Sequence, residues 1–351
     1  MLLEETIARI GELDEQAQEA ARRRSDNLTK PPGSLGMLED VAAQIAGITG
    51  KSLPWLEKKA VITMAGDHGV CAEGVSAFPQ EVTPQMVLNF LRGGAAINVL
   101  SRQAGARVVC VDMGMITPVD APGLVVRRIG AGTNNLAAGP AMTPDQARAA
   151  VEAGIEVAIQ EVAGGTELLA TGDMGIGNTT PSTAILAAFT GFPVAMLAGK
   201  GTGLDQPGVQ RKIKVVEKAL RINNPDPRDG LDVLAKVGGF EIGGLAGVIL
   251  GAAAARVPVV IDGFISGAAA MIARSLAPRS VNYMLASHLS EEPGHQVMLN
   301  WLGLKPMLHM RMRLGEGTGA VLAFHLIEAA LRILREMATF DEAGVTGEMI
   351  L

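Results

Sequence analysis

Short apolar runs alternate with longer segments of helical periodicity through the middle of the chain. The runs are rich in Val, Ile and Leu and lie at 60–65, 107–111, 167–170, 193–197, 258–261 and 282–285. Between them, residues 84–103, 144–162 and 180–189 carry apolar side chains at helical spacing. Continuous apolar strands that alternate with helices predict an α/β fold, in which a parallel sheet is covered by helices on both faces.

Both ends of the chain have helical patterns instead. Apolar residues recur at helical spacing over 3–24, 38–48 and 320–337. The segment 30–36 holds two prolines and two glycines, which predicts a loop. We therefore expect the terminal helices to pair into a small helical domain beside a larger α/β domain. The predicted boundaries are 1–50 and 316–351 for the small domain and 51–315 for the large one.

One stretch, 242–261, is apolar apart from Arg256. Pro258 divides it into an Ala/Gly-rich helical pattern and a Val-rich strand pattern, so a buried helix followed by a buried strand is favoured over a membrane span. The first residues are acidic and helix-patterned, unlike a secretory signal. We expect a cytoplasmic protein that does not associate with membranes.

Composition and charge exclude several classes of protein. The 351 residues are 48% apolar with a net charge of −6, which excludes a disordered chain. The one dense basic run, 22–24, is typical of a solvated helix face, so we expect no nucleic-acid partner. Cys71 and Cys110 are too few for a disulfide framework and have no metal-ligand spacing. They are expected to be small buried apolar residues.

Glycine, acidic and hydroxyl residues follow every predicted strand. These segments are 66–69, 112–114, 172–180, 199–205, 262–266 and 287–290. Right-handed crossovers bring the carboxyl ends of parallel strands to one edge, and ligands of open α/β sheets bind there. The same residue types also form ordinary turns. The concentration at all of the strand ends favours a ligand site.

The loop after the third run has the composition of a phosphate-binding loop. It combines two glycines with three donors at a predicted helix start: Gly175, Gly177, Asn178, Thr179 and Thr180. Glycines let the backbone approach a ligand closely, and a helix N-terminus attracts anions. The segment 199–203 repeats this chemistry and adds Lys200. Neither loop matches a P-loop or the dinucleotide-binding pattern, so a phosphate is indicated without ATP or NAD.

Other site chemistry is less specific. His68 stands beside Asp67, but no second histidine is near in sequence, so a hydrogen-bonded histidine is favoured over a metal ligand and no metal is expected. A Ser/His/Asp triad lacks its nucleophile-elbow motif. Glu316 lies among glycines directly before the C-terminal helix. It is either a carboxylate at a helix N-terminus or a general base, and the residues alone leave both open.

A set of motifs resembles a known family. The motifs are 29–36, 66–69 with 73–76, 79–83, 175–181, 236–240, 262–264, 287–290 and 312–319. In this order they resemble the nicotinate-nucleotide:5,6-dimethylbenzimidazole phosphoribosyltransferases, and the resemblance runs from about residue 5 to Leu351. It implies a Rossmann-like sheet with a small helical domain, a homodimer, and no cofactor or metal. The implied reaction transfers phosphoribose from nicotinate mononucleotide to a benzimidazole-type base, forming α-ribazole 5′-phosphate and nicotinate during cobalamin biosynthesis.

The resemblance also implies roles for individual residues. Glu316 matches the family's general base, and Asp173 matches an acidic position where well-known members carry glutamate. The family positions that contact the nucleotide phosphate and ribose match Gly175, Gly201, Lys212 and, from the neighbouring subunit, Ser290. On sequence alone, Lys212 is typical of a solvated helix charge.

Three positions that face the base in the family are Phe78, Met86 and Met174 here. Aromatic and thioether side chains bind flat rings through dispersion contacts and offer few directional hydrogen bonds. This predicts a permissive pocket that accepts several benzimidazoles and purines; alternatively, the three side chains simply pack against dimethylbenzimidazole.

Two other functions compete with this interpretation. A phosphoribosyltransferase that uses the diphosphate donor with magnesium usually carries paired acidic residues after a strand, and no such pair stands there in this sequence. A catalytically silent nucleotide-binding sensor could share the fold, but the presence of Glu316 argues against it.

Overall fold

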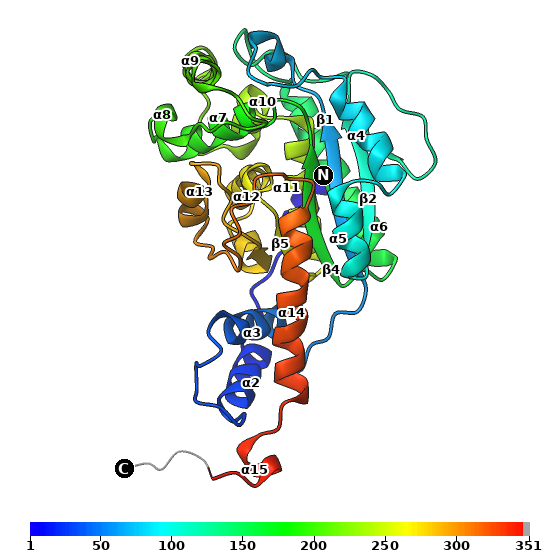
Figure 1. Cartoon of the computed structure of the whole chain (residues 1–351), viewed down its shortest axis with the longest axis vertical. Coiled ribbons are helices and arrows are strands. Elements are labelled where there is room, and N and C mark those ends of the chain that lie inside the picture. The colour runs from blue at the N-terminus through cyan, green and yellow to red at the C-terminus, as the bar shows by residue number, and fades with distance from the viewer. Residues whose placement is uncertain (347–351) are drawn as a thin grey trace.

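The computed structural model describes residues 1–346 and contains a six-stranded parallel sheet. The strands lie in the order β3-β2-β1-β4-β5-β6 (Figure 1). Their bounds are Lys59–Gly66 (β1), Ala106–Gly114 (β2), Val125–Val126 (β3), Leu168–Met174 (β4), Val259–Ile261 (β5) and Met284–Ala286 (β6). Every pairing is parallel, and in the centre Thr63 of β1 lies opposite Cys110 of β2 and Gly172 of β4. The predicted α/β fold is confirmed.

Alternate residues of the strands supply two separate cores, one on each face of the sheet. Ile62 and Met64 of β1 belong to the core that contains α6 and α11. Val61 and Ala65 belong to the core that contains residues of α3, α4, α5 and α14. Because strand side chains alternate between faces, burial of both sets explains why the sequence shows continuous apolar runs.

The helices have the following bounds. They are Leu2–Ala8 (α1), Glu15–Asp26 (α2), Met37–Thr49 (α3), Val82–Leu91 (α4), Ala96–Gln103 (α5), Pro144–Ala163 (α6), Thr179–Thr190 (α7), Val194–Leu197 (α8), Gln206–Asn223 (α9), Gly230–Val237 (α10), Phe240–Ala254 (α11), Phe264–Leu276 (α12), His295–Leu302 (α13), Thr318–Glu336 (α14) and Phe340–Ala343 (α15). Short 3₁₀ helices lie at Gly69–Glu73 and Pro278–Tyr283.

Glycines allow α6 and α11 to pack almost backbone to backbone. A Cβ added at Gly154 of α6 would lie 1.8 Å from the carbonyl oxygen of Gly244 in α11. The apolar stretch 242–261 therefore divides as expected, into the buried α11 and the buried strand β5. Over residues 1–346, no helix combines the length and apolar character needed to cross a membrane.

Helices from the N-terminal and C-terminal segments pack together below the sheet. Figure 1 shows α14 running from the sheet down to α2 and α3, and these three helices pack against one another. The first helix, α1, packs instead against α6 and α11 of the sheet layer.

Three expectations about individual elements were wrong. The segment 193–197 forms the short helix α8 and joins no strand. The predicted helix over 84–103 is two helices, because the chain turns at Gly93 and Gly94 between α4 and α5. The predicted helix over 3–24 is also two, because α1 ends at Ala8 and α2 starts after Asp14, whose carboxylate accepts a hydrogen bond from the backbone N–H of Ala17.

Candidate active site

A cavity of about 240 Å³ opens at the carboxyl ends of the central strands. Its walls come from the segments after β4, β5 and β6, from the loops at residues 78 and 201–202, and from the turn before α14. The lining residues are Phe78, Asp173, Asn178, Thr179, Gly201, Thr202, Gly263, Phe264, Ile265, His288, Ser290, Glu292, Arg313, Leu314 and Gly315. A separate cleft of about 360 Å³ lies between α2, α3 and β6, apart from these strand ends.

The backbone of Glu316 rests directly on the sheet. Its N–H donates to the carbonyl oxygen of Asp173 (3.2 Å), and its own carbonyl accepts from Thr63 Oγ1 (3.0 Å). A Cβ at Gly172 would lie 2.3 Å from the Glu316 carbonyl oxygen, so glycine is required beneath this turn. Glu316 has φ 65°, a conformation that costs a non-glycine residue free energy and persists where surrounding contacts enforce it.

The Glu316 side chain is 5% exposed and points toward the start of α5. Its Oε2 accepts a hydrogen bond from the backbone N–H of Ile97 at 3.2 Å. Burial raises the pKa of this carboxyl; the Ile97 hydrogen bond opposes the rise, and the negative charge of Asp262 adds to it. A carboxylate whose pKa is raised toward neutrality is suited to remove a proton as a general base.

Asp173 stands at the end of β4, on the cavity wall. Its Oδ2 accepts from Asn178 Nδ2 at 2.8 Å, while Oδ1 is buried with no hydrogen-bond partner within residues 1–346. Burial, and then the charge of Asp262, raise the pKa of Asp173 well above its ordinary value. A carboxyl group that retains its proton can donate a hydrogen bond to a ligand, which an ionised carboxylate cannot do.

The loop after β4 and the loop at Gly201 face each other across Lys212. Asn178 is the N-cap of α7, and Lys212 Nζ donates to Thr179 Oγ1 (3.0 Å) and to the carbonyl of Gly199 (3.1 Å). Lys212 is buried, so its interpretation as a solvated helix charge is wrong. Burial lowers the pKa of Lys212 to about 8, although the charge of Glu292 opposes this shift.

Gly201 is bracketed by a carboxylate and a guanidinium. Its N–H donates to Glu292 Oε1 and its carbonyl accepts from Arg313 Nη1, both at 2.9 Å. Sequence reasoning did not single out Glu292, Arg313 or His288 as site residues. Their only signal was their place inside or next to the motifs 287–290 and 312–319.

The structure brings most of the expected residues together. Phe78, Asp173, Asn178, Thr179, Gly201 and Ser290 line the cavity. The chain's own Ser290 stands on this wall, whereas the resemblance implied the serine of a neighbouring subunit. Gly175 and Gly177 lie in the loop before Asn178, Thr180 lies in the first turn of α7, and Glu316 follows Gly315 of the wall.

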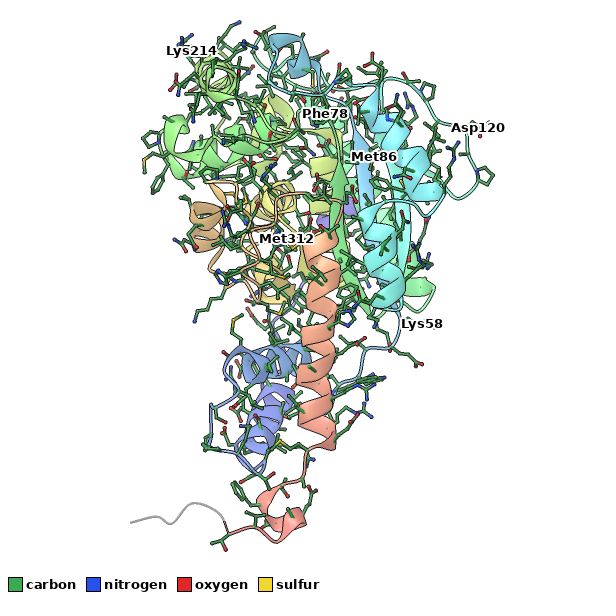
Figure 2. All side chains as sticks on the ribbon, in the orientation of Figure 1. Lys58, Phe78, Met86, Asp120, Lys214 and Met312 are labelled. Carbon is green, nitrogen blue, oxygen red and sulfur yellow. The ribbon has the colours of Figure 1, made fainter. Side chains whose placement is uncertain are left out.

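The three expected base-facing residues do not share one wall. Figure 2 shows Phe78 and Met86 at the carboxyl-terminal end of the sheet. Phe78 is 51% exposed and lines the cavity. Met86 and Met174 are half-buried against the core on the α4 and α14 face of the sheet.

His68 is fully buried and lies within hydrogen-bond distance of one carboxylate. Its Nε2 lies 2.7 Å from Glu241 Oε1, which confirms the hydrogen-bonded interpretation. This hydrogen-bonded pair packs beneath Gly175, because a Cβ at Gly175 would lie 3.2 Å from His68 Nε2. Within residues 1–346, no three His, Cys, Asp or Glu side chains converge as a metal site.

Known proteins resemble this chain over almost its whole length. The model of a family described as Phosphoribosyltransferase matches residues 10–345. The chain is 60% identical over 347 residues to the nicotinate-nucleotide–dimethylbenzimidazole phosphoribosyltransferase of Desulforamulus reducens, covering 98% of this chain and 99% of the relative. It is 62% identical over 346 residues to the protein of the same name from Chloroflexus aggregans, covering 98% of each.

The chain belongs to the nicotinate-nucleotide–dimethylbenzimidazole phosphoribosyltransferase family. The sequence resemblance is thereby confirmed. A solved structure, CobT from Thermus thermophilus, superimposes with a TM-score of 0.91 at 50% identity and covers 95% of this chain and 100% of that one. The sheet and its surrounding helices are thus the fold of this phosphoribosyltransferase family.

Proposed function

We propose that this protein transfers the 5-phosphoribosyl group of nicotinate mononucleotide to 5,6-dimethylbenzimidazole or a related base. The products are α-ribazole 5′-phosphate and nicotinate, and the reaction belongs to cobalamin biosynthesis. Membership of the family supports the substrates. The single observation that carries the chemistry is Glu316, a buried carboxylate with a raised pKa, held next to a cavity that also contains a phosphate-binding loop.

The leaving group needs no acid. Nicotinate mononucleotide carries a pyridinium, so when the bond from C1′ to the pyridine nitrogen breaks, the electron pair returns to nitrogen and neutralises the ring. One ring nitrogen of the benzimidazole attacks C1′, and the other loses its proton to Glu316. The protein therefore has to hold two rings in line and accept one proton. Positioning contributes about 7–11 kcal/mol in well-oriented reactions, and a general base adds about 10²–10⁴-fold.

Lys212 supplies positive charge beside Thr179, at the N-terminus of α7, and a helix N-terminus attracts an anion such as a 5′-phosphate. Asp173 lies on the cavity wall between this loop and Gly315. Its Oδ1 is buried and has no hydrogen-bond partner among the described residues, so a ribose hydroxyl of a bound nucleotide can be its partner. The loops after β4 and before α9 thus bind the nucleotide, and the turn before α14 provides the group that removes the proton.

The proposal also includes a homodimer. Phe78, Met310 and Leu314 are 51%, 57% and 59% exposed, and Phe78 and Leu314 line the cavity mouth. Exposed apolar side chains that gather around a site favour coverage by another surface, and we assign that surface to a second copy of the chain. We place the enzyme in the cytoplasm, consistent with two free cysteines whose pKa values burial raises to about 12.

A comparison of donors tests this function. The purified protein is incubated with dimethylbenzimidazole and either nicotinate mononucleotide or phosphoribosyl diphosphate with magnesium, and the products are identified by mass spectrometry. We expect α-ribazole phosphate and nicotinate from the mononucleotide only. Product from the diphosphate donor alone would assign the protein to the magnesium-dependent class. Binding of the mononucleotide without nicotinate release would identify a silent sensor.

A further inference from the structure

Asp262 caps the helix that follows Glu316, although it lies far from that helix in sequence. It comes directly after β5 and is 1% exposed. Its Oδ1 accepts from the backbone N–H of Ala320 (2.9 Å) and its Oδ2 from that of Gly317 (3.2 Å). Gly317 is the N-cap residue of α14 and has no side chain to cap it. Asp262 therefore supplies the acceptors that the first turn of this helix needs.

The sheet holds Asp262 rigidly in turn. Its N–H donates to Thr171 Oγ1 of β4 (3.3 Å), and its carbonyl accepts from Ser287 Oγ after β6 (2.8 Å). His288 Nδ1 lies 3.0 Å from Ser287 Oγ and 3.9 Å from Asp262 Oδ1. A chain of contacts thus links β4, β5 and β6 to the residue directly after Glu316.

We infer that Asp262 is a positioning residue for the proposed reaction, holding Glu316 in place and supporting its action as the proton acceptor. The inference rests on the proposed function. The other contacts of Glu316 leave its orientation incomplete: Thr63 and Asp173 bind only its backbone, and Ile97 binds a single carboxylate oxygen. Through Gly317, Asp262 anchors the turn on its remaining side.

The charge of Asp262 acts in addition to its hydrogen bonds. Burial raises the pKa of Asp262, while the charge of His288 and the backbone N–H groups that both of its oxygens accept oppose the rise and favour the ionised carboxylate. This negative charge raises the pKa of Glu316, after the larger effect of burial. The titratable groups around the pair are Asp173 on β4, Glu241 on α11 and His288 after β6. Without the Asp262 charge, Glu316 would lose its proton at lower pH and would be a weaker base.

The substitution Asp262→Asn tests the charge and the capping hydrogen bonds of Asp262 together. The carboxamide keeps one acceptor and the shape of the side chain but removes the charge. We expect kcat to fall about tenfold and the acid limb of the kcat–pH profile to move to lower pH. KM for nicotinate mononucleotide should change less than twofold, because Asp262 is not among the residues that line the cavity. Nicotinate release by the unsubstituted enzyme, measured alongside, tests the proposed function itself.

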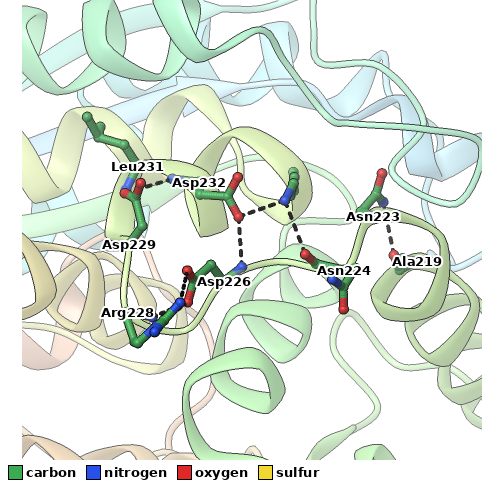
Figure 3. Close-up of polar contacts among 9 residues, drawn as sticks. Ala219, Asn223, Asn224, Asp226, Arg228, Asp229, Leu231 and Asp232 are labelled. Atoms are coloured by element: carbon green, nitrogen blue, oxygen red, sulfur yellow. Dashed lines mark hydrogen bonds and ion pairs between the residues drawn. The ribbon is translucent and has the colours of Figure 1, made fainter.

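Asp229→Asn is the matched control. Asp229 caps α10 by accepting from the backbone N–H groups of Leu231 (2.9 Å) and Asp232 (3.2 Å), away from the cavity (Figure 3). Because Asp229 is exposed, this control should lower Tm less than Asp262→Asn does, and it should leave kcat and its acid limb unchanged. If the Asp262→Asn profile superimposes on that of the unsubstituted enzyme, the inference is wrong.

A second variant covers the case in which Asp262→Asn does not fold. Ser287→Ala removes the hydroxyl that fixes the Asp262 backbone but keeps the carboxylate. It should lower kcat severalfold and leave the acid limb unchanged, because the Asp262 charge remains. An unchanged kcat in this variant would overturn the positioning role.

Discussion

Replacing Glu316 by glutamine changes one side-chain oxygen into an amide nitrogen and little else. The backbone contacts with Thr63 and Asp173 do not involve the side chain, and the glutamine oxygen can still accept the N–H of Ile97. The turn before α14 and the phosphate loop should therefore keep their geometry. The variant loses only the ability to accept the proton of the benzimidazole, since an amide is not a base at neutral pH.

The expected loss follows from this single function. A positioned general base contributes about 10²–10⁴-fold to rate, which corresponds to about 2.7–5.4 kcal/mol of transition-state free energy. Turnover of Glu316→Gln should fall within this range, while the Kd for nicotinate mononucleotide stays within about threefold. Stability should not fall, because a neutral amide replaces a carboxylate whose charged form is disfavoured by burial.

The assay combines nicotinate release, followed by chromatography, with calorimetric titration of the mononucleotide. In the unsubstituted enzyme, kcat should rise with pH as Glu316 loses its proton, and this acid limb should disappear in the variant. Glu336→Gln is a matched control on the same helix, because Glu336 is exposed and, within residues 1–346, pairs only with Arg332 one turn away. Turnover within tenfold of the unsubstituted enzyme would refute the assignment of Glu316 as the base. A loss of mononucleotide binding would show that Glu316 also contributes to nucleotide binding, which contradicts a role limited to proton removal.

Three further predictions concern substrate binding. The pKa of Lys212 is lowered to about 8, so above pH 8 the ammonium loses its charge and KM for nicotinate mononucleotide should rise. A Lys212→Met variant should have a high KM at every pH. A pH-independent KM in the unsubstituted enzyme would contradict this prediction. Gly175→Ala should raise KM at least tenfold, because its Cβ would meet the Gly66 carbonyl oxygen at 2.5 Å, whereas Gly139→Ala, with open space around it, should leave KM unchanged. Competition between dimethylbenzimidazole and adenine should give both ribosylated products, since Phe78 offers an aromatic face without hydrogen bonds; strict rejection of adenine would contradict a permissive pocket.

The sequence pattern predicted the layered fold because both faces of the sheet are buried. Runs such as 60–65 have no polar alternation, and a parallel sheet under two helical layers is the usual cause. The run 193–197 failed as a strand because a short apolar segment fits a buried helical turn equally well. Strand β3 was missed because only Val125 and Val126 pair with β2, which is too short for a periodic signal.

The candidate site was predicted only as far as local chemistry allows. The phosphate loop and Glu316 could be assigned to strand ends and helix starts, because glycines and donors there have local signatures. The buried position of Lys212 could not, since α9 carries charged neighbours and nothing local shows which side chain turns inward. The cap that Asp262 provides to α14 joins residues 55 apart, and only the folded sheet brings them together.

The most direct test of the account is the stoichiometry of the reaction at the proposed base. Nicotinate mononucleotide and dimethylbenzimidazole are incubated with the unsubstituted enzyme and with Glu316→Gln, and nicotinate and α-ribazole 5′-phosphate are quantified together. We expect equal amounts of both products from the unsubstituted enzyme and at least a hundredfold slower formation of both by the variant. Nicotinate released without α-ribazole phosphate, or equal rates from the two proteins, would contradict this expectation.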